Sequence, residues 1–388
     1  MTKPKIIYLC CLPLIEKREK DFFINEAADA GFSVEYWDLT KIYSPDIAFV
    51  GEVERRYVRK IENHCELEKM LSAQDIKRCF FVIIITFNGK VFKLHRLLTK
   101  NNCYLIFFAR AALPLDYANE SLFKRLSWDF SRYLNIDKIR MTCLTPIAKL
   151  YKRIGLIKDY DLVFAAGAAE ASQYNGRSLV VALNHFDYDS YLGVKNTAAR
   201  IIKHKYCVFL DDNLVYDTDF KSTNTRTIEP AAYFKSLCSF FTRLEKKHHL
   251  KVVIAAHPKA KYQGPEFGDR EIIKGKTNEL VKDCNFAIAH YSTSISFSVL
   301  YEKPLLFIYT NQMKEMHYFQ AIKHFASVLD ATILNIDTIS GNDELQISSP
   351  NRLRYEDYKY KYLKSKSTED KLSAGVFIQC MTELAASV

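Results

Sequence analysis

The chain has 388 residues, which is more than one ordinary domain needs and suits two. Hydrophobic residues make up 48% and charged residues 26%, a composition that excludes collagen-like, low-complexity and disordered classes. The formal net charge of +10 favours anionic partners, but no zinc-finger, RNP or basic-zipper pattern occurs, so we expect phosphorylated ligands or an acidic membrane surface rather than nucleic acid.

The ten cysteines are scattered and form no CxxC pair, which indicates a reducing compartment. The apolar run at the N-terminus is interrupted by charges after Ile15, so we expect a first buried strand there rather than a signal peptide. No apolar run approaches the roughly 20 residues needed to span a bilayer. These features predict a cytoplasmic protein.

Short apolar runs alternate with helix-like stretches in the first third of the chain. One helix is expected at Glu16–Ala30, ending at Gly31, and another ends near Leu98. Strands are predicted at Ile6–Leu12, Phe32–Leu39, Cys79–Thr86 and Tyr104–Phe108. Runs that are apolar on both faces and separated by helices predict a parallel sheet covered on both sides. No GxGxxG follows the first strand, so this half is expected to be Rossmann-like without the dinucleotide fingerprint.

Residues 121–158 mix bulky apolar side chains with many more Lys and Arg than acids. Such an aromatic, basic and amphipathic stretch can lie in an anionic membrane interface, which predicts peripheral contact with the inner face of the cytoplasmic membrane. An ordinary pair of surface helices with one buried apolar stripe explains the pattern equally well.

A second series of strands follows, with a helix at Pro230–His248 and one or two closing helices after residue 350. The predicted strands are Asp161–Ala166, Ser178–Leu183, Tyr206–Leu210, Lys251–Ala256, Cys284–Ala289 and Pro304–Tyr309. We therefore predict an α/β protein of two Rossmann-like domains facing across a cleft. The expected boundaries are an acceptor-binding domain at 1–190, a donor domain at 191–345, and helices at 346–388 that pack back on the domains. In each sheet the ligand should lie beyond the carboxyl ends of the strands.

Polar side chains follow three successive strands of the second half. These are Asp211 and Asp212 after the first, His257, Pro258 and Lys259 after the second, and Ser292, Thr293 and Ser294 after the third. Hydroxyls and free N–H groups at a helix start bind phosphate, and an imidazole held by a following proline can donate to a phosphate oxygen. Each feature has a plainer explanation, because Ser and Thr are favoured helix caps and a half-buried histidine can bond to a carbonyl. Taken together, they favour a phosphate site.

The ordered set FDYD (186–189), FLDD (209–212), His257-Pro258 and Ser292-Thr293-Ser294 resembles bacterial GT-B glycosyltransferases that use CMP-activated sugars. Sialyltransferases, polysialyltransferases and Kdo transferases of surface-polysaccharide synthesis carry such a His-Pro and Ser/Thr pair. The resemblance implies transfer of an ulosonic acid, Kdo or sialic-like, from a CMP donor to lipopolysaccharide, O-antigen or capsule. It also implies that His257 and the hydroxyls of residues 292–294 contact the donor phosphate, and that Glu302 holds the nucleotide ribose.

The catalytic carboxylate is left open, because the Asp/Glu-Asp/Glu-Gly triplet of sialyltransferases is missing from the first half. The candidates are Asp211, then Asp212, then Asp187, each of which could instead cap a turn. Asp187-Tyr-Asp189 and Asp217-Thr-Asp219 have the DxD form that binds a metal in GT-A enzymes. The two-domain layout and a donor with one phosphate predict no metal and no cofactor besides the nucleotide sugar.

Three other functions remain open at this point. A transferase of the same fold could use a CDP-polyol or a UDP-sugar. A nucleotide-sugar epimerase also combines two Rossmann-like domains with carboxylates between them. A non-enzymatic two-lobed binding protein would leave every donor intact.

Overall fold

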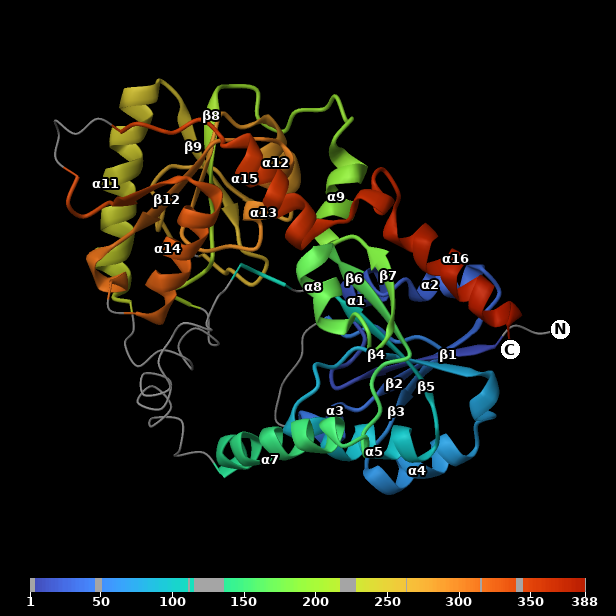
Figure 1. Cartoon of the computed structure of the whole chain (residues 1–388). Helices are drawn as coiled ribbons and strands as arrows, with labels where there is room; N and C mark the ends of the chain where they lie inside the picture. The colour runs from blue at the N-terminus through green and yellow to red at the C-terminus, as the bar shows by residue number, and fades with distance from the viewer. Residues whose placement is uncertain are drawn as a thin grey trace. The chain divides into compact units, whose positions relative to one another are not determined.

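A computed structural model of the chain describes residues 4–45, 51–110, 112–114, 136–216, 228–262, 264–314, 316–339 and 345–387 (Figure 1). The chain forms two compact units. Unit 1 contains the described residues that fall within 4–110, 136–184 and 365–387, and unit 2 contains those within 112–114 and 185–364. The boundary expected after residue 190 falls inside a helix of unit 2, whose Ser190 Oγ accepts a 2.8 Å hydrogen bond from Asn278. The expected C-terminal segment is divided between the units.

Unit 1 is built on a seven-stranded parallel sheet with the order β3-β2-β1-β4-β5-β6-β7. The structure confirms the four strands predicted in the first third of the chain. It also confirms the two strands predicted after residue 160. The short strand β3 was not predicted, because only its first residue is shielded from water. The strands are β1 Lys5–Cys10, β2 Ser33–Asp38, β3 Val58–Lys60, β4 Cys79–Ile83, β5 Tyr104–Ala109, β6 Leu162–Ala166 and β7 Leu179–Leu183.

Helices cover both faces of this sheet. They are α1 Glu16–Asp21, α2 Ile24–Asp29, α3 Thr40–Tyr43, α4 His64–Ser72, α5 Phe92–Lys100, α7 Ile136–Arg153, α8 Gly167–Tyr174 and α16 Ser373–Ala386. The single helix expected at Glu16–Ala30 is interrupted between α1 and α2. Phe23 has a left-handed φ of 56°, and its ring lies 6.1 Å from that of Phe108. The interruption therefore places an aromatic side chain in the core. The stability gained by burying this ring exceeds the stability lost by breaking the hydrogen bonds of a continuous helix.

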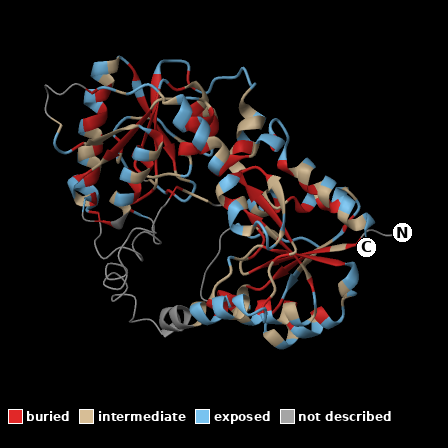
Figure 2. Cartoon of the chain, in the orientation of Figure 1, coloured by how far each residue is buried: buried red, intermediate tan, exposed pale blue. Residues whose placement is uncertain are grey.

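The core of unit 1 has two layers, one on each side of the sheet (Figure 2). Along β1, Ile7 and Leu9 face one layer, while Ile6 and Tyr8 face the other. This alternation within a fully buried strand is expected for a sheet covered on both sides. The second layer includes Phe377 and other residues of α16, so residues from both ends of the described chain pack in the same core layer. Figure 1 shows α16 beside α2.

Unit 2 is built on a six-stranded parallel sheet with the order β10-β9-β8-β11-β12-β13. The four predicted strands are confirmed, although the third is shorter than expected, and β10 and β13 were not predicted. The strands are β8 Tyr206–Leu210, β9 Lys251–Ala256, β10 Ile272–Lys274, β11 Ala287–Ala289, β12 Leu305–Tyr309 and β13 Thr332–Asn335.

The helices of unit 2 are α9 Phe186–Val194, α11 Pro230–His248, α12 Thr277–Asp283, α13 Ile295–Leu300, α14 His317–Leu329 and α15 Arg352–Tyr358. Helix α11 has the predicted bounds because its ends are encoded locally. The Glu229 side chain accepts hydrogen bonds from the amides of Ala231 and Ala232, Pro230 occupies the first turn, and His249 ends the helix with a φ of 49°. Such caps satisfy backbone groups that a helix end leaves unpaired. The two units, each a parallel sheet with helices, confirm the predicted α/β fold class of two Rossmann-like domains.

Candidate functional site

The order of strands in unit 2 marks one place where a ligand is expected. From the central strand β8 the chain adds β9 and β10 on one side, then returns to add β11, β12 and β13 on the other. The switch point therefore lies between β8 and β11, at the carboxyl ends of the strands, where open α/β sheets bind their ligands. Leu210 of β8 pairs with Ala255 of β9 and Ala289 of β11. The three strands therefore end at nearly the same height in the sheet, and the predicted site residues that come after them lie at one edge.

The Asp211 carboxylate connects the loops after β8 and β9. Its Oδ1 accepts a 2.9 Å hydrogen bond from the amide of Asn213. Its Oδ2 accepts a 3.0 Å bond from the amide of His257 and a 2.7 Å bond from the Tyr262 hydroxyl. The side chain is buried. Both oxygens are thus engaged in holding the site together, which favours a structural role for the residue ranked first from sequence.

Asp212 lies in a different environment. It is half-buried, and its Oδ2 accepts a 3.1 Å hydrogen bond from the amide of Tyr291 and a 2.6 Å bond from the Tyr318 hydroxyl. Burial raises the pKa of Asp212 to about 7, with repulsion from Asp211 adding to the effect, while hydrogen bonds from Tyr318, Tyr291 and Ser292 lower it. A carboxyl group whose pKa lies near neutrality can take up and release protons under physiological conditions.

A buried pair behind the acids supports the loop after β11. His290 Nδ1 lies 2.6 Å from the carbonyl oxygen of Ile308, and its Nε2 lies 3.0 Å from the Tyr233 hydroxyl. Burial lowers the pKa of His290 to about 4, so the ring is neutral. A neutral ring donates from Nδ1 to the carbonyl and accepts from the tyrosine at Nε2. Because both nitrogens are engaged, His290 serves packing rather than chemistry.

His257 is more exposed to solvent than the buried His290. It is half-buried, and its Nδ1 accepts a 3.2 Å hydrogen bond from the amide of Lys259. A neutral imidazole that accepts at Nδ1 carries its proton on Nε2 and can donate there. Pro258 and Lys259 are exposed beside it. The loop after β9 therefore combines an oriented N–H donor with a cation, as an anion site requires.

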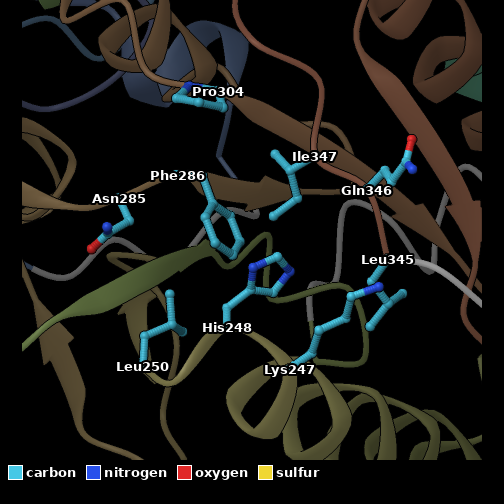
Figure 3. Close-up of a pocket in the computed structure, with 9 residues that line it drawn as sticks. All are labelled: Lys247, His248, Leu250, Asn285, Phe286, Pro304, Leu345, Gln346 and Ile347. Atoms are coloured by element: carbon cyan, nitrogen blue, oxygen red, sulfur yellow. The ribbon is translucent and has the colours of Figure 1, made fainter.

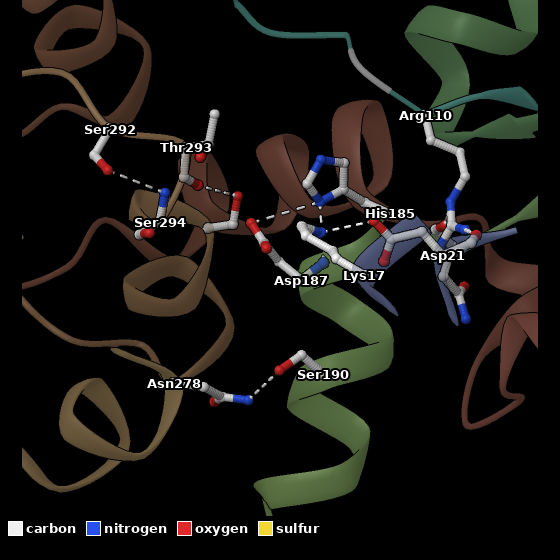
Figure 4. Close-up of polar contacts among 12 residues, drawn as sticks. Lys17, Asp21, Arg110, His185, Asp187, Ser190, Asn278, Ser292, Thr293 and Ser294 are labelled. Carbon is white, nitrogen blue, oxygen red and sulfur yellow. Dashed lines mark hydrogen bonds and ion pairs between the residues drawn. The ribbon is translucent and has the colours of Figure 1, made fainter. Parts of the chain in front are cut away.

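The Ser-Thr-Ser turn precedes α13, as predicted (Figure 4). Ser292 Oγ accepts a 3.3 Å hydrogen bond from the Ser294 amide, and the Thr293 carbonyl accepts a 2.9 Å bond from Ser296. These are the local turn contacts that the capping explanation predicts. Thr293 is exposed, while Ser292 also bonds to Asp212. The turn is thus linked to the acidic pair, and its hydroxyls lie at the same sheet edge.

Asp187 and Asp189 lie in the first turn of α9, the helix that opens unit 2. The amide of Asp187 donates a 3.2 Å hydrogen bond to His185 Nδ1, and the Asp187 carboxylate lies 3.5 Å from the same nitrogen (Figure 4). Burial raises the pKa of Tyr358, and the Asp187 carboxylate adds to that rise while a hydrogen bond with Ser296 opposes it. Asp187 therefore lies on the α13 side of unit 2. Asp217 and Asp219 lie outside the described residues.

Glu302 is not brought together with the other predicted residues. It follows the C-terminal end of α13 and precedes β12, whereas Ser292–Ser294 precede the N-terminal end of that helix. Its carboxylate forms a 3.3 Å ion pair with Arg352, and the two side chains are 58% and 85% exposed. Such exposed pairs contribute little to stability. Its predicted contact with ribose remains a prediction, without a neighbouring site residue to support it.

A pocket of about 630 Å³ lies in unit 2 away from all of these residues (Figure 3). Six lining residues precede β9, β11 or β12, at the amino edge of the sheet: Lys247, His248, Leu250, Asn285, Phe286 and Pro304. The other three, Leu345, Gln346 and Ile347, belong to the segment between β13 and α15. None of the residues predicted from sequence lines it. The chemistry at the carboxyl edge and this pocket are therefore separate features of the unit.

Sequence reasoning missed the tyrosines that surround the acidic pair. Tyr318 comes from α14, 106 residues after Asp212, and no local pattern predicts that contact. Tyr262 ends the segment AAHPKAKY, so its position beside His257 was visible, but its bond to Asp211 was not. Asn213 was also missed, although its φ of 53° and its buried side-chain oxygen without a partner in the described chain set it apart.

Metal-binding groups and membrane-spanning helices were both looked for among the described residues. They contain no group of three or more His, Cys, Asp or Glu side chains arranged to hold a metal ion. Among their helices, none combines the length and the apolar character that crossing a membrane requires.

The chain was compared with known proteins. No protein-family model and no curated protein matches it. Among solved structures, the spinosyn forosaminyltransferase SpnP is 12% identical with a TM-score of 0.45, over 99% of both chains. The Methanocaldococcus jannaschii UDP-GlcNAc 2-epimerase in complex with UDP-GlcNAc and UDP is 11% identical with a TM-score of 0.44, over 91% of this chain and 97% of that one. The glycotransferase of kitacinnamycin is 8% identical with a TM-score of 0.49, over the full length of both. Likeness of this degree assigns no reaction, so the chemistry must be argued from the side chains.

Proposed function

We propose that this protein is a glycosyltransferase that moves an ulosonic acid, Kdo or sialic-like, from a CMP donor to a bacterial surface glycan. The observation that carries the proposal is the half-buried Asp212 at the switch point of unit 2, whose pKa burial raises to about 7. A general base works best when its pKa lies near the working pH. Asp212 then has the basicity to accept the proton of an acceptor hydroxyl.

The donor phosphate is assigned to the loops after β9 and β11. His257 offers an Nε2–H group oriented by the Lys259 amide, and Lys259 adds a positive charge. The hydroxyls of Thr293 and Ser294 supply further donors, while the Ser292 hydroxyl donates to Asp212. A single phosphate can be neutralised by such groups. The proposed transfer accordingly uses no metal ion.

The reaction is written as a single displacement. The acceptor oxygen gives its proton to the Asp212 carboxylate and forms a bond to the anomeric carbon of the ulosonic acid. The bond between that carbon and the phosphate oxygen breaks, and its electron pair leaves with CMP. Hydrogen bonds from His257 and from the turn at residues 292–294 stabilise the charge that grows on the phosphate. This assignment of a base predicts inversion at the anomeric carbon.

Release of CMP tests the proposal directly. The purified chain is mixed with CMP-Kdo or with CMP-N-acetylneuraminic acid, with and without lipopolysaccharide core oligosaccharide as acceptor. Acceptor-dependent release of CMP supports the proposal. Release of UDP from a UDP-sugar in the same assay would assign the donor to another nucleotide, and interconversion of UDP-GlcNAc and UDP-ManNAc without acceptor would assign an epimerase.

The His257→Ala variant tests the phosphate site. Loss of an oriented donor to a developing charge is expected to lower turnover at least about 100-fold, without loss of fold because the histidine is only half-buried. His204→Ala, which alters an exposed histidine of the same unit, is the matched control. Turnover within about twofold of the unchanged protein in the His257 variant would remove His257 from the site.

A further inference from the structure

Large apolar side chains are unusually exposed over the last turns of α7 and the residues that follow. Ten such side chains are exposed among the described residues, and four of them fall between residues 147 and 156. Ile147 is 44% exposed, Leu150 53%, Ile154 60% and Leu156 53%. Ile147, Leu150 and Ile154 are spaced three and four residues apart, so they share one face of the helix. Scattered exposed leucines are ordinary, but a contiguous row indicates an interaction surface.

Exposed cations border this apolar row. Lys149 and Arg153 are both exposed and lie four residues apart, beside the apolar face. No acidic residue occurs between Asp137 and Asp159. The surface therefore offers an apolar row and a positive charge that no acid of the same segment neutralises.

The opposite face of α7 is fixed against unit 1. A Cβ atom on Gly89 would lie 2.6 Å from the Cβ of Leu144, so a glycine is needed for the helix to approach this closely. The amide of Gly89 donates a 3.1 Å hydrogen bond to Thr145 Oγ1, and the rings of Phe92 and Tyr151 lie 5.0 Å apart. These contacts decide which face of α7 points outward (Figure 2).

We propose that this outward face, named here the basic apolar face and made of Ile147, Lys149, Leu150, Arg153, Ile154 and Leu156, binds the surface of an anionic lipid bilayer. Apolar side chains enter the boundary between headgroups and acyl chains, while Lys and Arg pair with anionic headgroups. Charge complementarity favours this occupant over a second copy of the chain, since two faces that carry only cations repel each other. The contact is peripheral and independent of the reaction assigned to unit 2.

Vesicle sedimentation of the full chain tests the proposal. Binding is expected to vesicles that mix phosphatidylglycerol with phosphatidylcholine, to weaken with added salt, and to be weak on phosphatidylcholine alone. The double variants Leu150→Asn/Ile154→Asn and Lys149→Glu/Arg153→Glu should each lower the partition coefficient at least about 10-fold. Leu353→Asn, which alters a leucine 76% exposed in unit 2, is the matched control and should bind normally.

Several results would overturn the inference. These are equal binding to both vesicle types, no binding to either, or unchanged binding of both double variants. A chain that is dimeric in light scattering and becomes monomeric on Leu150→Asn/Ile154→Asn would show that the face joins two copies. Thermal unfolding of each variant verifies the fold, and exposed substitutions of this kind usually change stability only slightly.

Discussion

The two sheets have the same arrangement of strands around their switch points but very different side chains there. In unit 1 the switch point lies between β1 and β4, and in unit 2 it lies between β8 and β11. Strand β1 ends with Cys10 and is followed by Cys11, whereas β8 is followed by Asp211 and Asp212. The topology provides equivalent places, and the residues decide what chemistry each place can perform.

The electrostatics of the two places differ accordingly. Burial raises the pKa of the Cys10 and Cys11 thiols, so both stay protonated, and Cys10 Sγ lies 3.8 Å from the Ile84 carbonyl. A protonated buried thiol is a poor nucleophile. Burial raises the pKa of Asp212 to about 7, so this group exchanges protons near neutral pH. The comparison supports placing the proposed proton transfer in unit 2.

The largest expected effect is on turnover, from Asp212→Asn. An amide has the same shape but cannot accept the acceptor proton, so turnover should fall by about 10³-fold. The matched control is Asp38→Asn, which alters a buried carboxyl at the last residue of β2 in unit 1, where it accepts a 2.9 Å hydrogen bond from the Thr40 amide. Initial rates of CMP release measure both. Equal losses in the two variants would contradict the assignment to unit 2.

The next effect is on stability, from Asp211→Ala. This change leaves the amides of Asn213 and His257 and the Tyr262 hydroxyl without their buried acceptor. Hydrogen bonds to a charged group contribute about 1.5–3 kcal/mol each, so the free energy of unfolding should fall by roughly 3 kcal/mol or more. Urea unfolding measures it. Asp337→Ala, which removes an exposed acceptor from the Asn311 amide, should cost less than about 1 kcal/mol. A similar cost at both positions would mean that Asp211 does not hold the site together.

A smaller effect is expected on the pH dependence, from Tyr318→Phe. Turnover of the unchanged protein should rise with pH and level off above about 7, as Asp212 loses its proton. The Tyr318 hydroxyl stabilises the ionised carboxylate, so its removal raises the pKa of Asp212 and moves the rise to higher pH. Tyr355→Phe, which removes a hydroxyl bonded to the Lys303 carbonyl, should leave the profile in place. A profile that moves to lower pH, or stays fixed, in the Tyr318 variant would contradict the role of Asp212.

The smallest effect is expected from Glu302→Gln. Its exposed ion pair with Arg352 and its position before β12 place it away from the acidic pair, so turnover and the KM for the donor should change less than about twofold. Steady-state kinetics at varied donor concentration measures both. A rise of 10-fold or more in KM would instead support the contact with ribose that the family resemblance implies.

The sequence predicted those parts of the fold that have local signals. Helix α11 was predicted with its observed bounds because Pro230 and the residues after His248 mark its ends. The buried strands were predicted because their apolar runs are continuous. The edge strands β3, β10 and β13 were missed, since their side chains are partly or fully exposed and carry no apolar run.

Part of the candidate site could also be predicted, because some of its residues have local signals in the sequence. Asp211, Asp212, His257 and Ser292 could be expected at one sheet edge because each lies within three residues after the end of a strand. Their ranking could not be predicted, because it depends on which carboxylate the Tyr262 and Tyr318 hydroxyls reach. Those contacts join distant segments, and no spacing in the sequence encodes them.

The position of α16 has a consequence for how the protein is made. Phe377 and Met381 are fully shielded from water and pack with Ile6 and Tyr8, which the ribosome produces more than 360 residues earlier. Nascent unit 1 must therefore wait, with the part of one sheet face that α16 covers still exposed, until synthesis has passed through the whole of unit 2. A chain released before α16 would expose the aromatic face of Phe23, Phe108 and Phe164 and would depend on chaperones to stay in solution.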